Sequence, residues 1–163
     1  MAEPTTTYLR DALRDLLNAA AACLDDPPER RYISAGPPAL VGNCAVLAVY
    51  PALPRALTLD QPGEIPAPRR QPRVRRVDLM VELHRCVSTE KDPSRDTLDA
   101  EGVQHANDGW SLFAGLVYRL QQDLVFTTLA RPDLAKSANV DLAELVEPEG
   151  GMAGWRVTVG VAL

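Results

Sequence analysis

A histidine and a cysteine, His84 and Cys86, lie two residues apart within a stretch of alternating apolar and polar residues. In a β-strand, this spacing puts both side chains on one face. Imidazole nitrogen and thiolate sulfur both bind zinc, but a zinc site needs about four ligands. The nearest other cysteine in the chain, Cys44, is distant in sequence from this pair. We therefore interpret the pair as ordinary sheet surface, and we expect no metal site and no cofactor.

A second pair of reactive side chains, His105 and Asp108, lies three residues apart in a stretch with helical spacing. An imidazole beside a carboxylate can act as a general base. Ser111, however, is not in the GxSxG setting of an activated serine. The sequence also lacks the GxxxxGK[ST] and GxGxxG loops that bind phosphates. We interpret the pair as helical surface and predict no catalytic residues, no cofactor-binding residues and no enzyme activity.

A dense cluster of positive charge places five arginines within eight residues, and we name it the arginine elbow. Without it, the remaining 12 basic and 22 acidic side chains give a net charge of −10 in place of −5. An acidic body with one basic patch can pair with copies of itself. Guanidinium groups also bind DNA phosphates, but no interleaved aromatic residues or nucleic-acid-binding motif accompany the cluster. A subunit interface is our interpretation, with DNA contact and plain solvated charge as alternatives, for Arg69, Arg70, Arg73, Arg75 and Arg76.

The elbow overlaps the start of a long alternating stretch, from Arg73 to Val87. A period of two residues predicts a β-strand with one apolar face and one mostly polar face. The stretch is longer than the usual strand, so we expect it to project past its sheet or to line a subunit contact, with the polar face exposed. The apolar face comprises Val77, Leu79, Val81, Leu83 and Val87, and the polar face Asp78, Met80, Glu82, His84 and Cys86.

Two stretches show the apolar spacing of helices that pack on a core. The first covers residues 5–25 and ends before Pro27, and the second begins at Asp96 and continues to about Thr128. Gly102 and Asp108-Gly109 weaken the second helix, so we expect a kink or break there. The predicted buried stripes are Leu9, Leu13, Leu16, Ala20 and Cys23 or Leu24 in the first helix, and Trp110, Phe113, Leu116 or Val117, Leu120 and Leu124 in the second.

The remaining pattern predicts strands and one long loop. A short strand is expected at residues 29–34, and a second strand, apolar on both faces as in the middle of a sheet, at about 42–53. A hairpin is expected at 142–147 and 155–163 around a Pro-Glu-Gly-Gly turn. Residues 51–72 hold six of the 14 prolines, which favours an extended loop because proline fixes φ and removes a backbone donor.

Together, the loop and the elbow form an arm at residues 51–76. The order α-β-β-arm-β-α-β-β predicts a single α+β domain over residues 1–163. We expect a largely antiparallel or mixed sheet of four to five strands packed on two main helices.

The composition, with 46% hydrophobic and 24% charged residues, is that of a globular domain. The three cysteines are odd in number and widely spaced, so we expect buried thiols and no disulfide framework. No apolar run approaches the ~20 residues needed to span a bilayer, and the N-terminus lacks a signal peptide. We therefore expect a cytoplasmic protein or one assembled in a cytoplasm.

Several of these stretches also occur together in a known family. The stretches are an N-terminal helix ending in Asp-Pro, a long helix with Asp108, Trp110 and Leu112, and the segments PPALVGNCAVLAVYPAL, VDLMVELHRCV and EPEGGMAGWRVTVGVAL. This layout resembles the tail terminator (neck) proteins of long-tailed, siphovirus-type phages that infect actinobacteria. The resemblance covers nearly the whole chain, in short patterns and layout.

The resemblance implies a structural virion protein that forms a ring, a hexamer in that family, at the top of the phage tail. Such a ring stops polymerisation of the tail tube and provides the docking surface for the head. The implied partners are further copies of the chain, the tail tube protein below and the head connector or stopper protein above, with DNA contact only through the ring lumen. Alternatives are another head-to-tail connector or tail-completion protein, or a DNA-contacting accessory protein that uses the elbow.

Overall fold

The computed structural model describes residues 4–39, 45–52, 55–56, 75–88, 93–127, 138–149 and 151–162. This part of the chain forms two helices and a mixed six-stranded sheet, so the expected α+β class is confirmed. The elements are α1 (Pro4–Ala22), β1 (Arg30–Ile33), β2 (Ala45–Pro51), β3 (Arg55–Ala56), β4 (Arg75–Cys86), α2 (Arg95–Gln121), β5 (Asn139–Glu149) and β6 (Met152–Ala162). The proline-rich residues 57–72 lie outside the described residues.

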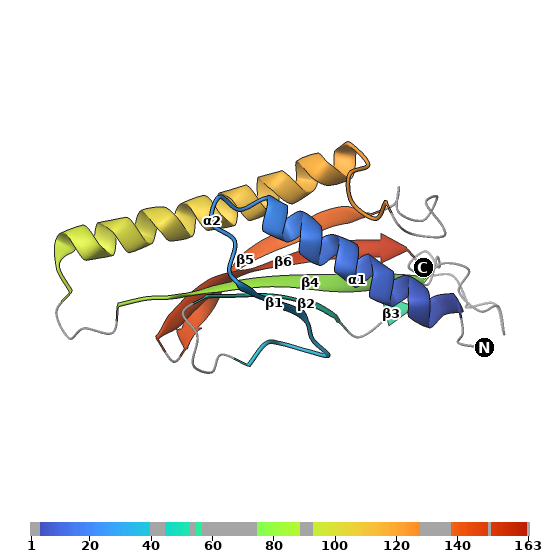
Figure 1. The fold of residues 1–163 in the computed structure, drawn as a ribbon, viewed down its shortest axis with the longest axis horizontal. Coiled ribbons are helices and arrows are strands. Elements are labelled where there is room, and N and C mark those ends of the chain that lie inside the picture. The colour runs from blue at the N-terminus through green and yellow to red at the C-terminus, as the bar shows by residue number, and fades with distance from the viewer. Residues whose placement is uncertain are drawn as a thin grey trace, which may run out of the picture.

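The long strand β4 lies at the centre of the sheet, whose order is β1-β2-β4-β6-β5 (Figure 1). β1 pairs with β2 in parallel, and every other pairing is antiparallel. β6 pairs with β4 from Arg76 to Cys86, and β3 pairs with the first two residues of β4. β4 is therefore paired along its length and does not project past its sheet. The other expectation for this strand, that it lines a subunit contact, stays a prediction.

Both helices cover the same face of the sheet, which we name the helix face (Figure 1). The main core forms there because the apolar stripe of α1, centred on Leu16 and Ala20, meets the apolar side of β4. Alternate residues of a strand point to opposite faces, so β4 presents its other side chains on what we name the second face. The prediction of which β4 residues face the helices is confirmed for Val77, Leu79, Val81 and Leu83.

The helix α2 is held against β6 by a glycine–tryptophan contact. A side-chain carbon added at Gly109 would lie 2.3 Å from the Trp155 ring, so only glycine allows this approach. The indole Nε1–H of Trp155 also donates to the carbonyl of His105, at 2.8 Å. The helix is continuous from Arg95 to Gln121, so the expected break near Gly109 is absent, and that glycine serves packing.

The buried side of α2 differs from the predicted stripe. Of the expected residues, Leu116 is buried, whereas Trp110 and Leu124 are exposed. The apolar spacing gave the wrong stripe because two residues that are not large and apolar take inner positions. Asp108 is buried in an ion pair with Arg85, and Gly109 packs against Trp155. The buried residues of α2 are Asp108, Gly109, Leu112 and Leu116.

Among the described helices, neither is long and apolar enough to cross a membrane.

Candidate functional site

The arginine elbow lies largely outside the described residues. Arg69, Arg70 and Arg73 are not described, and Arg75 and Arg76 are described only as backbone at the start of β4. There, Arg75 pairs with Ala56 and Arg76 with Arg55, in the short β3–β4 ladder. The elbow as a subunit interface therefore stays a prediction.

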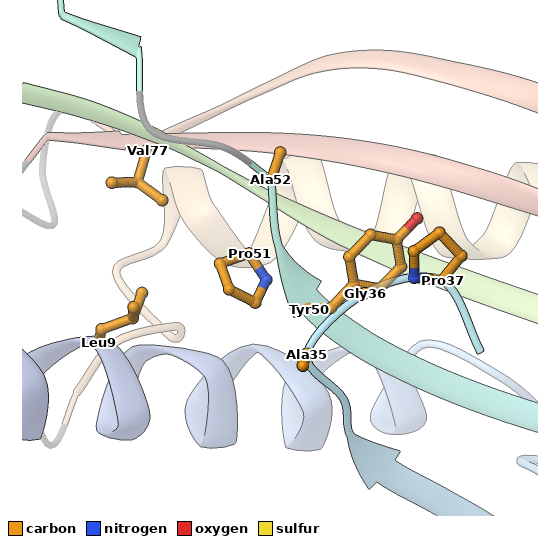
Figure 2. A pocket seen from close by; sticks show the side chains of 8 residues that line it. All are labelled: Leu9, Ala35, Gly36, Pro37, Tyr50, Pro51, Ala52 and Val77. Atoms are coloured by element: carbon orange, nitrogen blue, oxygen red, sulfur yellow. The ribbon is translucent and has the colours of Figure 1, made fainter. Parts of the chain in front are cut away.

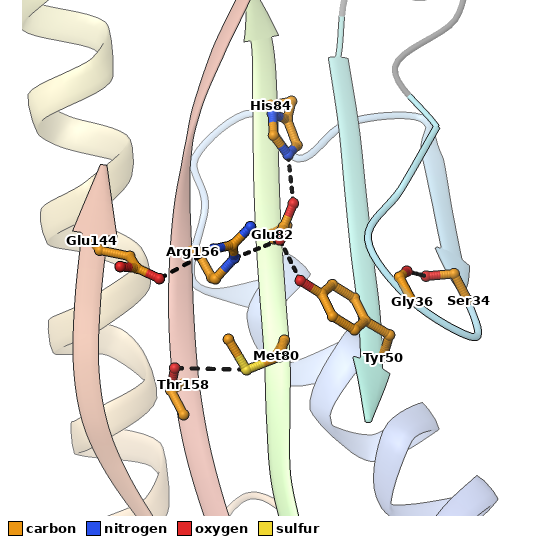
Figure 3. Close-up of polar contacts among 9 residues, drawn as sticks. All are labelled: Ser34, Gly36, Tyr50, Met80, Glu82, His84, Glu144, Arg156 and Thr158. Carbon is orange, nitrogen blue, oxygen red and sulfur yellow. Dashed lines mark hydrogen bonds and ion pairs between the residues drawn. The ribbon is translucent and has the colours of Figure 1, made fainter. Parts of the chain in front are cut away.

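On the second face of the sheet, a buried carboxylate collects donors from three strands (Figure 3). Glu82 of β4 accepts hydrogen bonds from the Tyr50 hydroxyl of β2 and from Arg156 Nε of β6, the latter at 2.6 Å. His84 Nε2 lies 2.8 Å from the other Glu82 oxygen, and Arg156 also reaches Glu144 of β5 at 3.3 Å. These five residues form what we name the Glu82 cluster.

The hydrogen bonds and charges in the Glu82 cluster favour the ionised form of the Glu82 carboxyl. Burial alone would raise the pKa of Glu82, but hydrogen bonds from His84, Tyr50 and Arg156 lower it to about 2. Burial and the neighbouring Glu82 carboxylate both raise the pKa of Tyr50, so its phenol stays protonated as a donor. Burial lowers the pKa of Arg156, but the bond to Glu82 outweighs it and raises that pKa. A fixed negative charge is thus held between a phenol, an imidazole and a guanidinium.

The Glu82 cluster corrects the expectation of an exposed polar face on β4. Glu82 and His84 do point away from the helices, but each is only 2% exposed. Their burial depends on side chains from β2 and β6, strands distant in sequence, so the alternation within β4 could not reveal it. The pattern of β4 alone predicted the side of each residue and missed its surroundings.

The chemistry available to the Glu82 cluster is limited by its enclosure. A carboxylate, an imidazole and a phenol could act as acids and bases, yet side chains this buried cannot contact a substrate in the described conformation. The Nδ1 atom of His84 has no hydrogen-bond partner among the described residues. A side-chain carbon at Gly154 would lie 2.9 Å from that atom and 2.1 Å from the Leu83 carbonyl, so the neighbouring strand presses closely against it.

The cysteines differ from the expectation of three buried thiols. Cys86 is exposed and disulfide-bonded, so it cannot serve as a free metal ligand beside His84. Cys23 is free and half-buried, and burial raises the pKa of its thiol. Cys44 lies outside the described residues. No group of three or more His, Cys, Asp or Glu able to hold a metal occurs in the described part of the chain.

On the helix face, Arg85 joins β4 to α2 by an ion pair and to the loop after α1 by a hydrogen bond. Arg85 Nε lies 2.6 Å from Asp108 Oδ2, and an Arg85 terminal nitrogen lies 3.1 Å from Oδ1 and donates to the Asp26 carbonyl at 2.7 Å. Asp108 is buried in this bidentate pair, so its interpretation as helical surface is wrong. Its partner is Arg85 and not His105, whose carbonyl instead accepts from Trp155.

The outer side of α2 carries large apolar side chains that nothing in the described part of the chain covers. Val103, Trp110 and Tyr118 are spaced by seven and eight residues, about two helical turns each, and therefore lie on one side of the helix. Trp110 is 73% exposed, and the other two are more than half exposed. We name these three residues the α2 stripe. Exposed patches of this kind commonly mark protein–protein contacts.

The strand β5 at one edge of the sheet also carries exposed apolar side chains. Leu142 and Leu145 are both more than half exposed. Leu145 lies opposite Trp155 and Leu142 opposite Thr158, so the two leucines point to opposite faces of the sheet. At the other edge, Ile33 of β1 is also exposed. Both edges of the sheet therefore combine exposed apolar side chains with an outer side that no other described strand pairs with.

A pocket of about 470 Å³ opens between α1 and the end of β2 (Figure 2). Its lining is apolar except for Tyr50, whose hydroxyl is already bonded to Glu82. A catalytic pocket needs several convergent polar groups. The described lining offers no carboxylate, imidazole or thiol: it consists of Leu9, Ala35, Gly36, Pro37, Tyr50, Pro51, Ala52 and Val77.

Neither protein-family models nor curated proteins give a match to this chain.

Proposed function

We propose that the chain is a structural virion protein, a ring-forming subunit at the top of a phage tail. In this role it stops polymerisation of the tail tube and offers the surface on which the head docks. Its partners are further copies of itself in a hexameric ring, the tail tube protein below and a head connector or stopper protein above. It is assembled in the cytoplasm of the bacterial host and has no catalytic role.

The observation that carries this proposal is the α2 stripe. An exposed tryptophan, tyrosine and valine on one side of a helix form a surface suited to a protein partner, since aromatic side chains dominate the energetic centres of interfaces. β5 adds two exposed leucines at one edge of the sheet, Leu142 and Leu145, which point to opposite faces. A ring subunit in a stack needs separate surfaces for its neighbours in the ring and for the proteins above and below it.

The interior supports the same proposal. Glu82, Arg156 and Tyr50 satisfy one another inside the sheet, and Arg85 and Asp108 do so under α2. Reactive side chains used in this way fix the packing of strands and helices, and these five are bound to one another in the described part of the chain. The favoured role is therefore a rigid building block.

Another head-to-tail connector or a tail-completion protein would use similar surfaces and is the closest alternative. A DNA-contacting accessory protein would instead depend on the elbow, whose arginines could bind phosphates. The two classes differ in salt response and partner. DNA retention that falls with salt while the protein stays monomeric would favour the accessory protein.

The experiment is a head–tail joining assay with a phage that lacks this protein. Added wild-type protein is expected to restore joined particles with tails of uniform length. Trp110→Ser with Tyr118→Ser should fold but fail to restore them, whereas the matched exposed pair Arg10→Ser with Arg95→Ser should succeed. Joined particles formed at wild-type yield by the Trp110 and Tyr118 variant would contradict the role given to the α2 stripe.

A further inference from the structure

The two edges of the sheet are β1 and β5. The strand order β1-β2-β4-β6-β5 puts them at opposite ends, each with a single neighbouring strand among the described residues. β5 is eleven residues long and pairs with β6 alone in the described sheet. The backbone N–H and C=O groups on the outer side of an edge strand are a template for another strand. The sheet therefore offers a docking position at each end.

The two edges carry opposite charge. β1 has the sequence RRYI, with two arginines and no acid, whereas β5 has the sequence NVDLAELVEPE, with four acids and no base. Arg31 on β1 and Asp141 and Glu144 on β5 are exposed. A β5 edge would repel a second β5 edge, and a β1 edge would repel a second β1 edge, because like charges would face each other. The remaining combination, β1 with β5, is attractive.

The strand directions also suit a contact between opposite edges. β1 runs parallel to β2, and three antiparallel pairings lead from β2 to β5, so β1 and β5 run in opposite directions. If neighbouring copies are related by a rotation about an axis roughly along the strands, each copy keeps its strand direction. The β1 edge of one copy then meets the β5 edge of the next as an antiparallel pair, which forms the better-aligned backbone hydrogen bonds.

We propose that copies of this chain associate by antiparallel pairing of the β1 edge of one copy with the β5 edge of the next. The contact covers Ile33 on one side and Leu142 and Leu145 on the other, the exposed apolar side chains of these two strands. It joins two different surfaces, so repeated rotation closes a ring where a self-complementary contact would stop at a dimer. The inference rests on the proposed ring for its closure and names the surfaces that build it.

The test uses two charge-reversed variants of the full chain. Variant A carries Arg30→Glu and Arg31→Glu, which make both of its edges acidic. Variant B carries Asp141→Lys, Glu144→Lys and Glu147→Lys, which leave one acid against three lysines on β5 and so make both of its edges basic on balance. Native mass spectrometry with size-exclusion light scattering reports the assembly, and circular dichroism reports the fold. Each variant alone is expected to associate at least about tenfold more weakly than wild type, because like charges meet at every contact.

A mixture of A and B in equal amounts is expected to recover assembly, since the β1 edge of each variant now complements the β5 edge of the other. The recovered rings should contain equal numbers of A and B. A control variant, Arg10→Glu with Arg95→Glu, makes the same charge change as A at exposed positions on the helices and is expected to assemble like wild type.

The remaining outcomes separate this inference from the proposed function. Rings that persist in A alone and B alone would overturn the edge pairing and leave the ring intact. Open filaments that depend on the same charges would support the pairing and overturn the closed ring. Wild-type protein that stays monomeric at every concentration would overturn both. A control variant that loses assembly as A does would trace the loss to net charge and overturn the pairing.

Discussion

Polar side chains usually lie outside a protein and large apolar ones inside. The Glu82 cluster departs from this because its polar side chains are buried, and the α2 stripe departs from it because its apolar side chains are exposed. In the cluster, a carboxylate, an imidazole and a phenol lie inside the protein, and Glu82 is 2% exposed. In the stripe, a tryptophan lies outside at 73% exposure. Position alone would mark either one as a functional site. Their partners distinguish them, because Glu82 accepts from three side chains whereas the stripe is covered by none of the described residues.

The comparison indicates which region acts within the chain and which acts outside it. Buried polar groups are stable only when their hydrogen bonds are satisfied, and the Glu82 carboxylate achieves this with side chains of β2, β4 and β6 (Figure 3). A large exposed aromatic side chain contributes the free energy of burying its apolar surface only when a partner covers it. Changes in the cluster should therefore affect folding, and changes in the stripe should affect assembly.

The largest expected effect on stability comes from Glu82→Ala. Removing this carboxylate leaves Arg156, Tyr50 and His84 without their common partner, which should cost about 3–5 kcal/mol in the free energy of unfolding. Glu144→Ala removes the half-exposed end of the same network and should cost at most about 1 kcal/mol. Chemical denaturation of both variants gives the two values. A similar small loss in both would contradict the account of the cluster as a structural centre.

The second prediction concerns acid. The pKa of Glu82 is lowered from 4.5 to about 2, so its stabilising effect is complete above pH 4.5 and is lost as the pH falls towards 2. Across this window, the wild-type free energy of unfolding should fall by roughly 3 kcal/mol more than that of Glu82→Gln. Denaturation at pH 6, 4 and 2.5 measures the difference. Parallel pH profiles for the two proteins would show that this carboxylate is not held in its charged form.

The two tryptophans provide a matched pair for the third prediction. Trp155 packs on Gly109 and donates to the His105 carbonyl, so Trp155→Ala should lose about 3 kcal/mol of stability. Trp110→Ala should change stability by less than about 0.5 kcal/mol, because the side chain is exposed. In a variant whose tryptophan at 155 is replaced by Phe, the emission of Trp110 should shift to the blue on assembly. Equal stability losses at the two positions would remove the distinction between inner and outer aromatic residues.

The smallest expected effect on stability lies in the arginine elbow. Arg73, Arg75 and Arg76 replaced together by Glu should leave the free energy of unfolding within about 0.5 kcal/mol of wild type, since they precede the apolar part of β4. The same variant should fail to form rings, and wild-type assembly should weaken with salt. Light scattering at two salt concentrations and a DNA-retention assay separate the outcomes. Lost DNA retention with intact rings would favour the DNA-contacting alternative, and no change in either assay would identify the elbow as solvated charge.

Local pattern in the sequence was enough to predict the α+β class and some of its elements. Alternation in β4 identified its apolar face, and the Pro-Glu-Gly-Gly turn identified the hairpin of β5 and β6. The apolar face of β4 follows from the two-residue period of its side chains, and the hairpin follows from a turn between residues close in sequence. The proline-rich arm lies outside the described residues, so its conformation stays a prediction.

The errors occurred where contacts between distant residues decide the outcome. The pairing of Asp108 with Arg85 and the packing of Gly109 on Trp155 set the inner side of α2, and this leaves Trp110 outside. The hydrophobic pattern of the helix alone favoured Trp110 as a core residue. The disulfide bond of Cys86 likewise depends on proximity in space, which the spacing of three cysteines does not reveal.

The most direct measurement of the central claim is the mass of the full chain in solution, taken by native mass spectrometry across a range of protein concentrations and paired with negative-stain images. We predict one closed assembly of fixed stoichiometry, six copies in a ring, formed without DNA. Trp110→Ala is expected to leave the monomer folded in the same experiment. A chain that remains monomeric at every concentration, or that forms a continuous range of sizes, would contradict the account of a ring-forming structural subunit.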